Sequence, residues 1–184
     1  MPSLTVHGGT LGATQIVAVA GGSATLGEVR ALAGLPADCA LFINGFPYRD
    51  GDVTLDAAKW DGAAPVYAGQ ARITLAAAAQ HASKTSLWLV LHAPSVFGPA
   101  AGGAASSGWG VYDLTAYSSE HPGGLGVMLA VAGKDATSDY VSVGHSAAAK
   151  RILMKLPVGA LCPTCAAALD KELEKAKSGG CSVA

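Results

Sequence analysis

Two histidines, each in a glycine-containing motif, place the strongest constraint on how this chain folds. His121 begins the run His121-Pro122-Gly123-Gly124, and His145 follows 24 residues later in Val143-Gly144-His145-Ser146. Proline fixes the backbone after the first histidine, and glycine lets the backbone approach a flat ligand closely. The pair therefore predicts that two imidazoles approach one planar group from opposite faces, as the two axial ligands of a haem iron.

An iron bound by two protein nitrogens has no open position for substrate or oxygen. Its expected chemistry is to take up and pass on single electrons. The other histidines, His7, His81 and His92, are expected to be structural, with His92 at the surface at the end of a strand. No Ser/His/Asp spacing, paired-carboxylate signature or flavin or nicotinamide fingerprint competes. We expect an electron carrier, not an enzyme.

Length, net charge and cysteine count restrict the class of protein and its expected environment. The 184 residues suffice for one large domain or two small ones, and a net charge of −1 predicts no attraction to nucleic acid. No apolar run reaches the ~20 residues of a spanning helix, and the first nine residues lack the pattern of a secretory signal. Four scattered cysteines indicate a reducing, cytoplasmic environment.

The first 70 residues predict a compact β-rich unit. Strands are expected at 4–6, 15–19, 39–43, 53–55 and 65–67, with tight turns at Asn44-Gly45 and Asp50-Gly51. Thr25 and Glu28 form a capping-box pattern that begins a short helix with Leu26, Val29 and Leu32 on one face. The order strand, strand, helix, strand, short strand, strand resembles ubiquitin and its β-grasp relatives.

The sign of the charge changes near residue 70, which favours a domain boundary there. Residues 1–70 carry three basic and six acidic side chains, whereas residues 71–165 carry six basic and four acidic ones. Beyond the boundary, the apolar run 87–92 predicts a strand, 93–110 a long insert loop and 111–114 a returning strand. Phe97 or Trp109 in that loop either covers an open edge of the ligand site or belongs to a flexible segment.

Five blocks in the second part resemble the haem-binding domain of cytochrome b5 over about residues 71–160. They are Trp88–His92, Val111–Thr115, Glu120–Gly124, Ala132–Thr137 and Val143–Ser146. The resemblance implies an α+β fold in which a ubiquitin-like β-grasp domain (1–70) precedes a cytochrome b5-like domain (71–162). It also implies non-covalent haem b with His121 and His145 as the axial ligands.

The family pattern also implies which residues hold the haem. Ser146 matches a hydroxyl that hydrogen-bonds a haem propionate in the family, and the remaining positions supply an apolar slot or a close backbone approach. The predicted pocket is Leu91, Leu114, Tyr117, Gly123, Gly124, Val127, Met128, Ala136, Tyr140, Val143, Ser146 and Ile152.

One departure from the family concerns charge. The family commonly carries acidic residues after the first motif and before the second histidine, where this chain has Leu125, Gly126, Ser138 and Ser142. Steering toward a basic partner such as cytochrome c is expected to be weak. We predict a slow reaction with that partner that is insensitive to salt.

The resemblance implies electron transfer from a flavin-containing reductase to an acceptor such as a membrane oxygenase or desaturase. The alternative is a haem-dependent regulatory or adaptor protein, whose ubiquitin-like domain binds a partner protein. A reversible spectrum with low-spin iron in both redox states supports the first function. Rapid haem loss, or carbon monoxide binding to the reduced form, supports the second.

The C-terminal segment 163–184 is expected to be a solvated helical tail with a thin apolar stripe. Cys181-Ser182-Val183-Ala184 loosely matches a farnesylation signal, so Cys181 is either a prenyl anchor to a cytosolic membrane face or unmodified. The single motif Cys162-Pro163-Thr164-Cys165 supplies only half of a zinc ligand set. It is either structural or a reversible disulfide.

Overall fold

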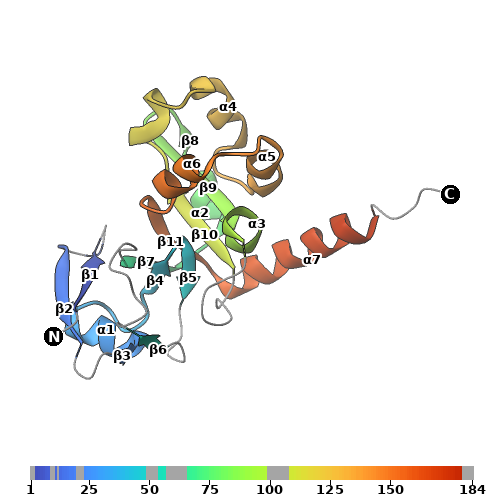
Figure 1. The fold of residues 1–184 in the computed structure, drawn as a ribbon. Helices are drawn as coiled ribbons and strands as arrows, with labels where there is room; N and C mark the ends of the chain where they lie inside the picture. The colour runs from blue at the N-terminus through green and yellow to red at the C-terminus, as the bar shows by residue number, and fades with distance from the viewer. Residues whose placement is uncertain are drawn as a thin grey trace.

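One sheet runs through the whole molecule in the computed structural model, which describes residues 3–8, 11, 13–19, 23–48, 54–56, 66–98 and 108–179. Nine strands follow the order β2-β1-β7-β11-β10-β9-β8, with β4 paired to β7 and β5 to β4 (Figure 1). The strands of this sheet are β1 (Ser3–His7), β2 (Gln15–Ala18), β4 (Ala40–Ile43), β5 (Phe46–Tyr48), β7 (Val66–Ile73), β8 (Ala82–Ser83), β9 (Ser86–His92), β10 (Trp109–Asp113) and β11 (Pro157–Leu161). A separate ladder pairs β3 (Ser23–Thr25) with β6 (Thr54–Asp56).

Short helices connect and cover these strands. They are α1 (Leu26–Leu32), α2 (Leu75–Ala79), α3 (Ala93–Phe97), the 3-10 helix η3 (Ala116–Ser119), α4 (Gly124–Val131), α5 (Thr137–Ser142), α6 (Ala147–Leu153) and the longer α7 (Pro163–Gly179). None of the helices in the described ranges combines the length and the apolar character needed to cross a bilayer.

The first helix begins at the predicted capping box. The hydroxyl of Thr25 accepts from the backbone N–H of Glu28, and the carboxylate of Glu28 accepts from the backbone N–H of Thr25 at 2.7 Å. The predicted buried face is correct for Leu26 and Val29 but wrong for Leu32, which is 61% exposed. At about 100° per residue, Leu32 has rotated away from the core, and Arg30 lies close to the Leu26 face instead.

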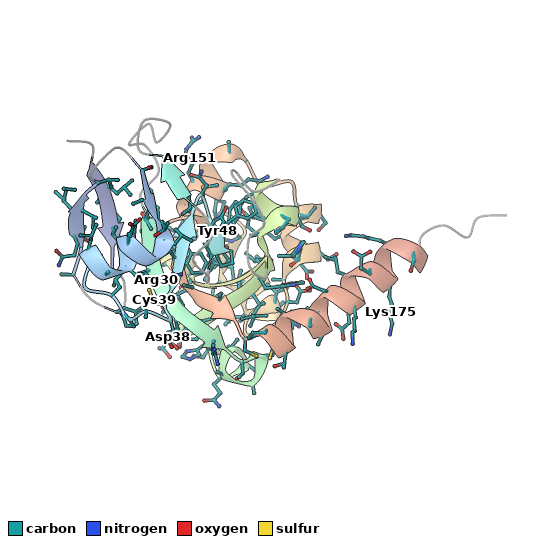
Figure 2. All side chains as sticks on the ribbon, turned by 90° about the horizontal axis from the view of Figure 1, so that it is seen from below. Arg30, Asp38, Cys39, Tyr48, Arg151 and Lys175 are labelled. Atoms are coloured by element: carbon teal, nitrogen blue, oxygen red, sulfur yellow. The ribbon has the colours of Figure 1, made fainter. Side chains whose placement is uncertain are left out.

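Arg30 is buried in the N-terminal part and makes hydrogen bonds there. Its Nε donates to the carbonyl of Cys39 at 2.9 Å, and its NH2 group donates to the carbonyl of Tyr48 at 3.3 Å. Figure 2 shows the three residues close together in the N-terminal part of the molecule. The guanidinium therefore satisfies two backbone acceptors that would be costly to bury unpaired.

The N-terminal strands are arranged around β7. The β1–β2 hairpin lies on one side, with β1 parallel to β7, and β4 pairs antiparallel on the other side, followed by β5. The predicted tight turn between β4 and β5 is present, with positive φ at Asn44 and Gly45. The predicted turn at Asp50-Gly51 lies outside the described residues.

The two parts of the chain share β7. Its first residues pair with β1 and β4, whereas Gln70 and Ile73 are in register with Gly159 and Leu161 of β11. The predicted boundary at residue 70 therefore falls inside a continuous strand. Gly159 lies so close to the backbone of Gln70 that no Cβ fits there, which allows the two parts to join.

Alternation along β9 separates two cores in the C-terminal part. Leu87, Leu89 and Leu91 face a cluster that includes Met128 of α4, Leu153 of α6 and Tyr112. Trp88 and Val90 face the opposite cluster, with Val111, Val158 and residues of α2 and α7. Successive side chains of a strand point to opposite faces, so α4 and α6 cover one face of the sheet and α2 and α7 the other.

The predicted insert loop 93–110 is wrong at both ends. Residues 93–97 form α3, and Trp109 begins β10, buried and in register with His92 of β9. Phe97 packs against Gly45, at the junction of the two parts of the chain, so neither aromatic ring covers the ligand site. His92 is half-buried, and burial is the main reason that its pKa lies below the ordinary value. Residues 99–107 lie outside the described part.

The first half of α7 is not a solvated tail. Ala166 and Leu169 are buried against the sheet, and the indole Nε1 of Trp109 donates to the carboxylate of Asp170 at 2.7 Å. Only the later turns project from the molecule, with Lys175 in solvent (Figure 2). Cys165 and Leu173 pack against the same cluster, so the apolar stripe of the helix faces the sheet.

Candidate functional site

His121 is held in a turn between η3 and α4. The backbone N–H of Gly124 donates to the carbonyl of His121 at 2.9 Å and closes the turn, with Gly124 at a φ of +76°. The imidazole folds over Gly123, where a Cβ would lie only 2.9 Å from the ring. Glycine at 123 thus makes room for the ring of the histidine itself.

His145 is held in the connection between α5 and α6. Its ring stacks on that of Tyr140, with 4.0 Å between the ring centres and 10° between the planes. Its Nδ1 lies 2.9 Å from the backbone carbonyl of Tyr140. A carbonyl only accepts hydrogen bonds, so Nδ1 carries the proton and Nε2 keeps its lone pair for a ligand.

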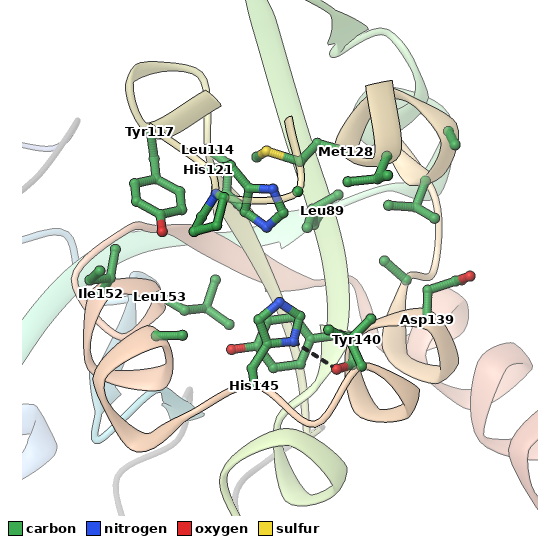
Figure 3. A pocket seen from close by; sticks show the side chains of 18 of the residues that line it. Leu89, Leu114, Tyr117, His121, Met128, Asp139, Tyr140, His145, Ile152 and Leu153 are labelled. Atoms are coloured by element: carbon green, nitrogen blue, oxygen red, sulfur yellow. Dashed lines mark hydrogen bonds between the residues drawn. The ribbon is translucent and has the colours of Figure 1, made fainter. Parts of the chain in front are cut away.

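The two imidazoles face each other across a cavity of about 670 Å³. Their ring centres are 6.3 Å apart, and Figure 3 shows a ring nitrogen of each imidazole pointing toward the other ring. η3 and α4 form the wall that carries His121, and α5 and α6 form the wall that carries His145. Such a volume is in the ~300–1,000 Å³ range of sites that enclose small molecules or cofactors.

Ten of the twelve predicted pocket residues line this cavity together with both histidines. They are Leu114, Tyr117, Gly123, Val127, Met128, Ala136, Tyr140, Val143, Ser146 and Ile152. Leu91 and Gly124 are not among the lining residues. Leu91 is fully buried two residues further along β9, and Leu89 lines the cavity in its place.

Sequence reasoning missed several lining residues. Alternation along β9 identifies which leucines share a face, but only the tertiary structure shows which of them reaches the cavity. The missed positions are Leu89, Pro122, Ala130, Val131, Asp139, Ser142, Ala149, Leu153 and Leu156. Most lie one turn from a predicted residue on α4, α5 or α6, so helical spacing was the signal that could have found them.

Large apolar side chains at the cavity are exposed to solvent. Val127 is 55% exposed, Val143 70% and Ile152 38%. Since all three line the cavity, a bound apolar group would bury surface that the chain itself leaves uncovered. This is the behaviour of a site that encloses a ligand with one open edge.

Two polar atoms at the cavity are buried without a hydrogen-bond partner among the described residues, namely Nδ1 of His121 and the hydroxyl of Tyr140. Burial raises the pKa of Tyr140 to about 12, with a smaller contribution from Tyr117.

The ring of Tyr117 lies edge-on to the ring of His121, with 6.0 Å between the ring centres, and the ring of Tyr140 stacks on that of His145. Each histidine is therefore supported by one tyrosine ring.

The site offers two strong donors for a metal, not a full coordination shell. Within the described ranges no three His, Cys, Asp or Glu side chains come together. Two imidazoles on opposite sides suit a metal whose remaining positions are filled by a macrocycle. Cys181, the predicted lipidation site, lies outside the described residues.

Comparison with known proteins finds relatives of part of this chain. Residues 108–162 match the model of the Cytochrome b5-like Heme/Steroid binding domain, a shorter stretch than the predicted domain 71–162. A cytochrome b5 of Borago officinalis is 37% identical over 86 residues, which cover 47% of this chain and 53% of that protein. The chain thus spans about half the length of this curated relative.

Two further matches have different extents. An NADH-cytochrome b5 reductase-like protein of Emericella nidulans is 37% identical over 94 residues, 51% of this chain and 17% of that protein. The solved structure of Ectothiorhodospira vacuolata cytochrome b558, described as a prokaryotic homologue of cytochrome b5, is 32% identical, with a TM-score of 0.37. It covers 48% of this chain and 95% of that one. Residues 108–162 are thus similar to the Cytochrome b5-like Heme/Steroid binding domain, and this stretch contains both His121 and His145.

Proposed function

We propose that this protein is an electron carrier that binds haem b non-covalently, with His121 and His145 as the two axial ligands. The observation that carries the proposal is the pair of imidazoles facing each other across an apolar cavity, 6.3 Å between ring centres. When bound, haem would supply one-electron chemistry, and His121 and His145 would be the residues that hold it.

His121 and His145 would hold the haem between them. Their ring centres lie 6.3 Å apart, with the His121 ring folded over Gly123 and the His145 ring stacked on Tyr140. Both walls are thus preorganised for a ligand between them.

The surrounding residues orient the imidazoles and exclude water. The carbonyl of Tyr140 holds the proton of His145 on Nδ1, and hydrogen bonding of this kind fixes the tautomer of a ligating histidine. Leu89, Leu114 and Met128 supply an apolar floor. The Ser146 hydroxyl accepts from the backbone N–H of Ala149 as the N-cap of α6, which leaves its own proton available for a carboxylate such as a propionate.

We propose a flavin-containing reductase as the electron donor and a membrane oxygenase or desaturase as an acceptor. The reductase is supported by the match between this chain and a segment of an NADH-cytochrome b5 reductase-like protein. Leu125, Gly126, Ser138 and Ser142 carry no charge where the family commonly has acidic residues, and Asp139 is the one acidic residue among those that line the cavity. Docking is expected to depend on shape and apolar contact and to respond weakly to ionic strength.

Absorption spectra of haem-loaded protein test the proposal. Low-spin spectra are expected in the oxidised and dithionite-reduced states, without carbon monoxide binding. His121→Ala and His145→Ala are each expected to lose the low-spin spectrum, with circular dichroism reporting the fold. His7→Ala removes a remote histidine and is expected to behave as wild type. Either cavity variant that keeps both affinity and low-spin iron contradicts the ligand assignment.

We also propose that residues 1–70 form a ubiquitin-like β-grasp unit. The strand order β2-β1-β7-β4-β5 and the helix α1 after the first hairpin support it. Ile16, 76% exposed on β2, offers an apolar contact to a partner protein. A haem-regulated adaptor would use this surface. In that case partner binding differs between haem-free and haem-loaded protein, whereas an electron carrier binds this partner equally in both forms.

A further inference from the structure

A second cluster of reactive side chains lies at the start of α7. β11 ends at Leu161, Cys162 follows, and the helix begins at Pro163. The backbone N–H of Cys162 donates to the carbonyl of Ile73 at 2.8 Å, which attaches this cysteine to the end of β7. Both thiols of the motif therefore lie at the N-terminal end of a seventeen-residue helix.

The two cysteines are inequivalent. The sulfur of Cys162 accepts from the backbone N–H of Cys165 at 3.4 Å and is hydrogen-bonded to the Thr164 hydroxyl at 3.2 Å. Both thiols are partly exposed, and Cys165 packs against the cluster that contains Leu75 and Trp88. A helix N-terminus favours negative charge, and the first turn of α7 holds no acidic residue to oppose it.

The pKa values differ in the same sense. Burial raises the pKa of Cys162, but hydrogen bonds from Cys165 and Thr164 outweigh it, and the pKa lies below its ordinary value. The hydrogen bond with Cys162 raises the pKa of Cys165. The lower-pKa thiol has the larger thiolate fraction at neutral pH and is the better nucleophile of the pair.

We propose that Cys162 and Cys165 form a thiol–disulfide exchange site, with Cys162 as the nucleophile and Cys165 as the resolving thiol. Residues three apart in a turn have Cα atoms within about 7 Å, which a disulfide spans. No third metal ligand joins the pair within the described ranges. The proposal does not rest on haem binding.

The reaction balances with a low-molecular-weight disulfide such as oxidised glutathione as the oxidant. The Cys162 thiolate attacks one sulfur of the disulfide, forms a mixed disulfide and releases one thiolate. The Cys165 thiol then loses its proton and attacks the sulfur of Cys162, which forms the internal disulfide and releases the second thiolate. Two electrons and two protons pass from the protein to the oxidant, which leaves as two thiols.

Mass spectrometry of the full chain after incubation with oxidised glutathione tests the proposal. Trypsin releases residues 156–171 with both cysteines, and this peptide is expected to lose about 2 Da on formation of the disulfide. Cys165→Ser is expected to accumulate glutathione on Cys162. Cys162→Ser is expected to react at Cys165 at least tenfold more slowly. Cys181→Ser, which leaves the pair intact, is expected to behave as wild type.

Three results would overturn the proposal. The first is no internal disulfide in wild type, and the second is equal rates of glutathione addition in Cys162→Ser and Cys165→Ser. The third is stoichiometric zinc binding by two copies of the chain, measured with zinc alone, that protects both thiols from oxidation. Circular dichroism of each variant verifies that the fold is retained.

Discussion

The N-terminal part (residues 3–48) and the part that carries the two histidines (residues 114–156) fill their cores differently. Protein side chains fill the N-terminal cluster, Ala93 and Phe97 of α3 among them, and the buried Arg30 hydrogen-bonds two carbonyl groups. The part that carries the two histidines leaves a cavity of about 670 Å³, with exposed valines among its lining residues and two buried polar atoms that have no partner in the described part of the chain. Protein side chains thus fill one core, whereas the other keeps a cavity that a bound group would fill.

The largest expected effect is the stabilisation of one part of the molecule, and not the other, by bound haem. At a free haem concentration 1,000-fold above Kd, binding stabilises the folded state by about 4 kcal/mol. Hydrogen exchange is expected to slow mainly over residues 114–156 and to change little over residues 3–48. Equal protection of both segments would show that the shared strand β7 joins them into one cooperative unit.

Replacement of Arg30 tests whether the N-terminal part is stabilised independently of the haem site. Arg30→Met leaves the carbonyls of Cys39 and Tyr48 without this donor, and we expect a loss of about 3 kcal/mol in the free energy of unfolding. Urea denaturation measures the loss, and the haem spectrum is expected to stay unchanged. Arg72→Met, at an exposed position of β7, is the control. A perturbed haem spectrum in Arg30→Met would mean that the parts are coupled.

Two glycines in and beside α4 test the fit of the His121 ring. Gly123→Ala places a Cβ 2.9 Å from the imidazole and should weaken haem binding about tenfold, or about 1.4 kcal/mol. Gly126→Ala meets no atom within 4 Å and should stabilise the helix by up to about 1 kcal/mol. Haem titration and thermal unfolding of both variants measure the difference. Similar affinities would show that the ring does not need this space.

The smallest expected effect concerns the unpartnered hydroxyl of Tyr140. Tyr140→Phe keeps the stacking on His145 and removes the buried hydroxyl, so we expect a gain of about 1 kcal/mol at neutral pH. Burial raises the folded-state pKa from 10.0 to about 12. The wild type should therefore lose stability as pH rises from 10 through 12, and the variant should lose less. Parallel curves over this range would contradict that assignment.

Features that depend on neighbouring residues were predicted correctly from the sequence. The capping box at Thr25 and Glu28 and the turn at Asn44-Gly45 need only local hydrogen bonds and glycine or asparagine backbone freedom. The structure also places the rings of His121 and His145 on either side of one cavity, whereas binding of a planar group between them stays a prediction. Local chemistry and spacing suffice for such features.

The errors arise where distant segments decide the outcome. Leu32 was predicted to be buried and is exposed, Leu91 was expected at the ligand and lies deeper in the core, and Trp109 was assigned to a loop and begins a strand. Each depends on which element packs against it, which periodicity does not specify. Strand alternation predicts on which face of the sheet a side chain lies. Whether that side chain reaches the cavity depends on its position along the strand relative to the helices that cover the sheet.

The sequence by itself predicted that the two histidines act together, and its resemblance to cytochrome b5 predicted ten of the residues that line the cavity with them. The ligand stays a prediction. Only the tertiary structure decided that β7 serves both parts of the chain and that α7 docks through Ala166 and Leu169. It also decided that each histidine lies against one tyrosine ring. Long-range strand pairing and packing depend on the free energy of the whole chain, and no local pattern of residues specifies them.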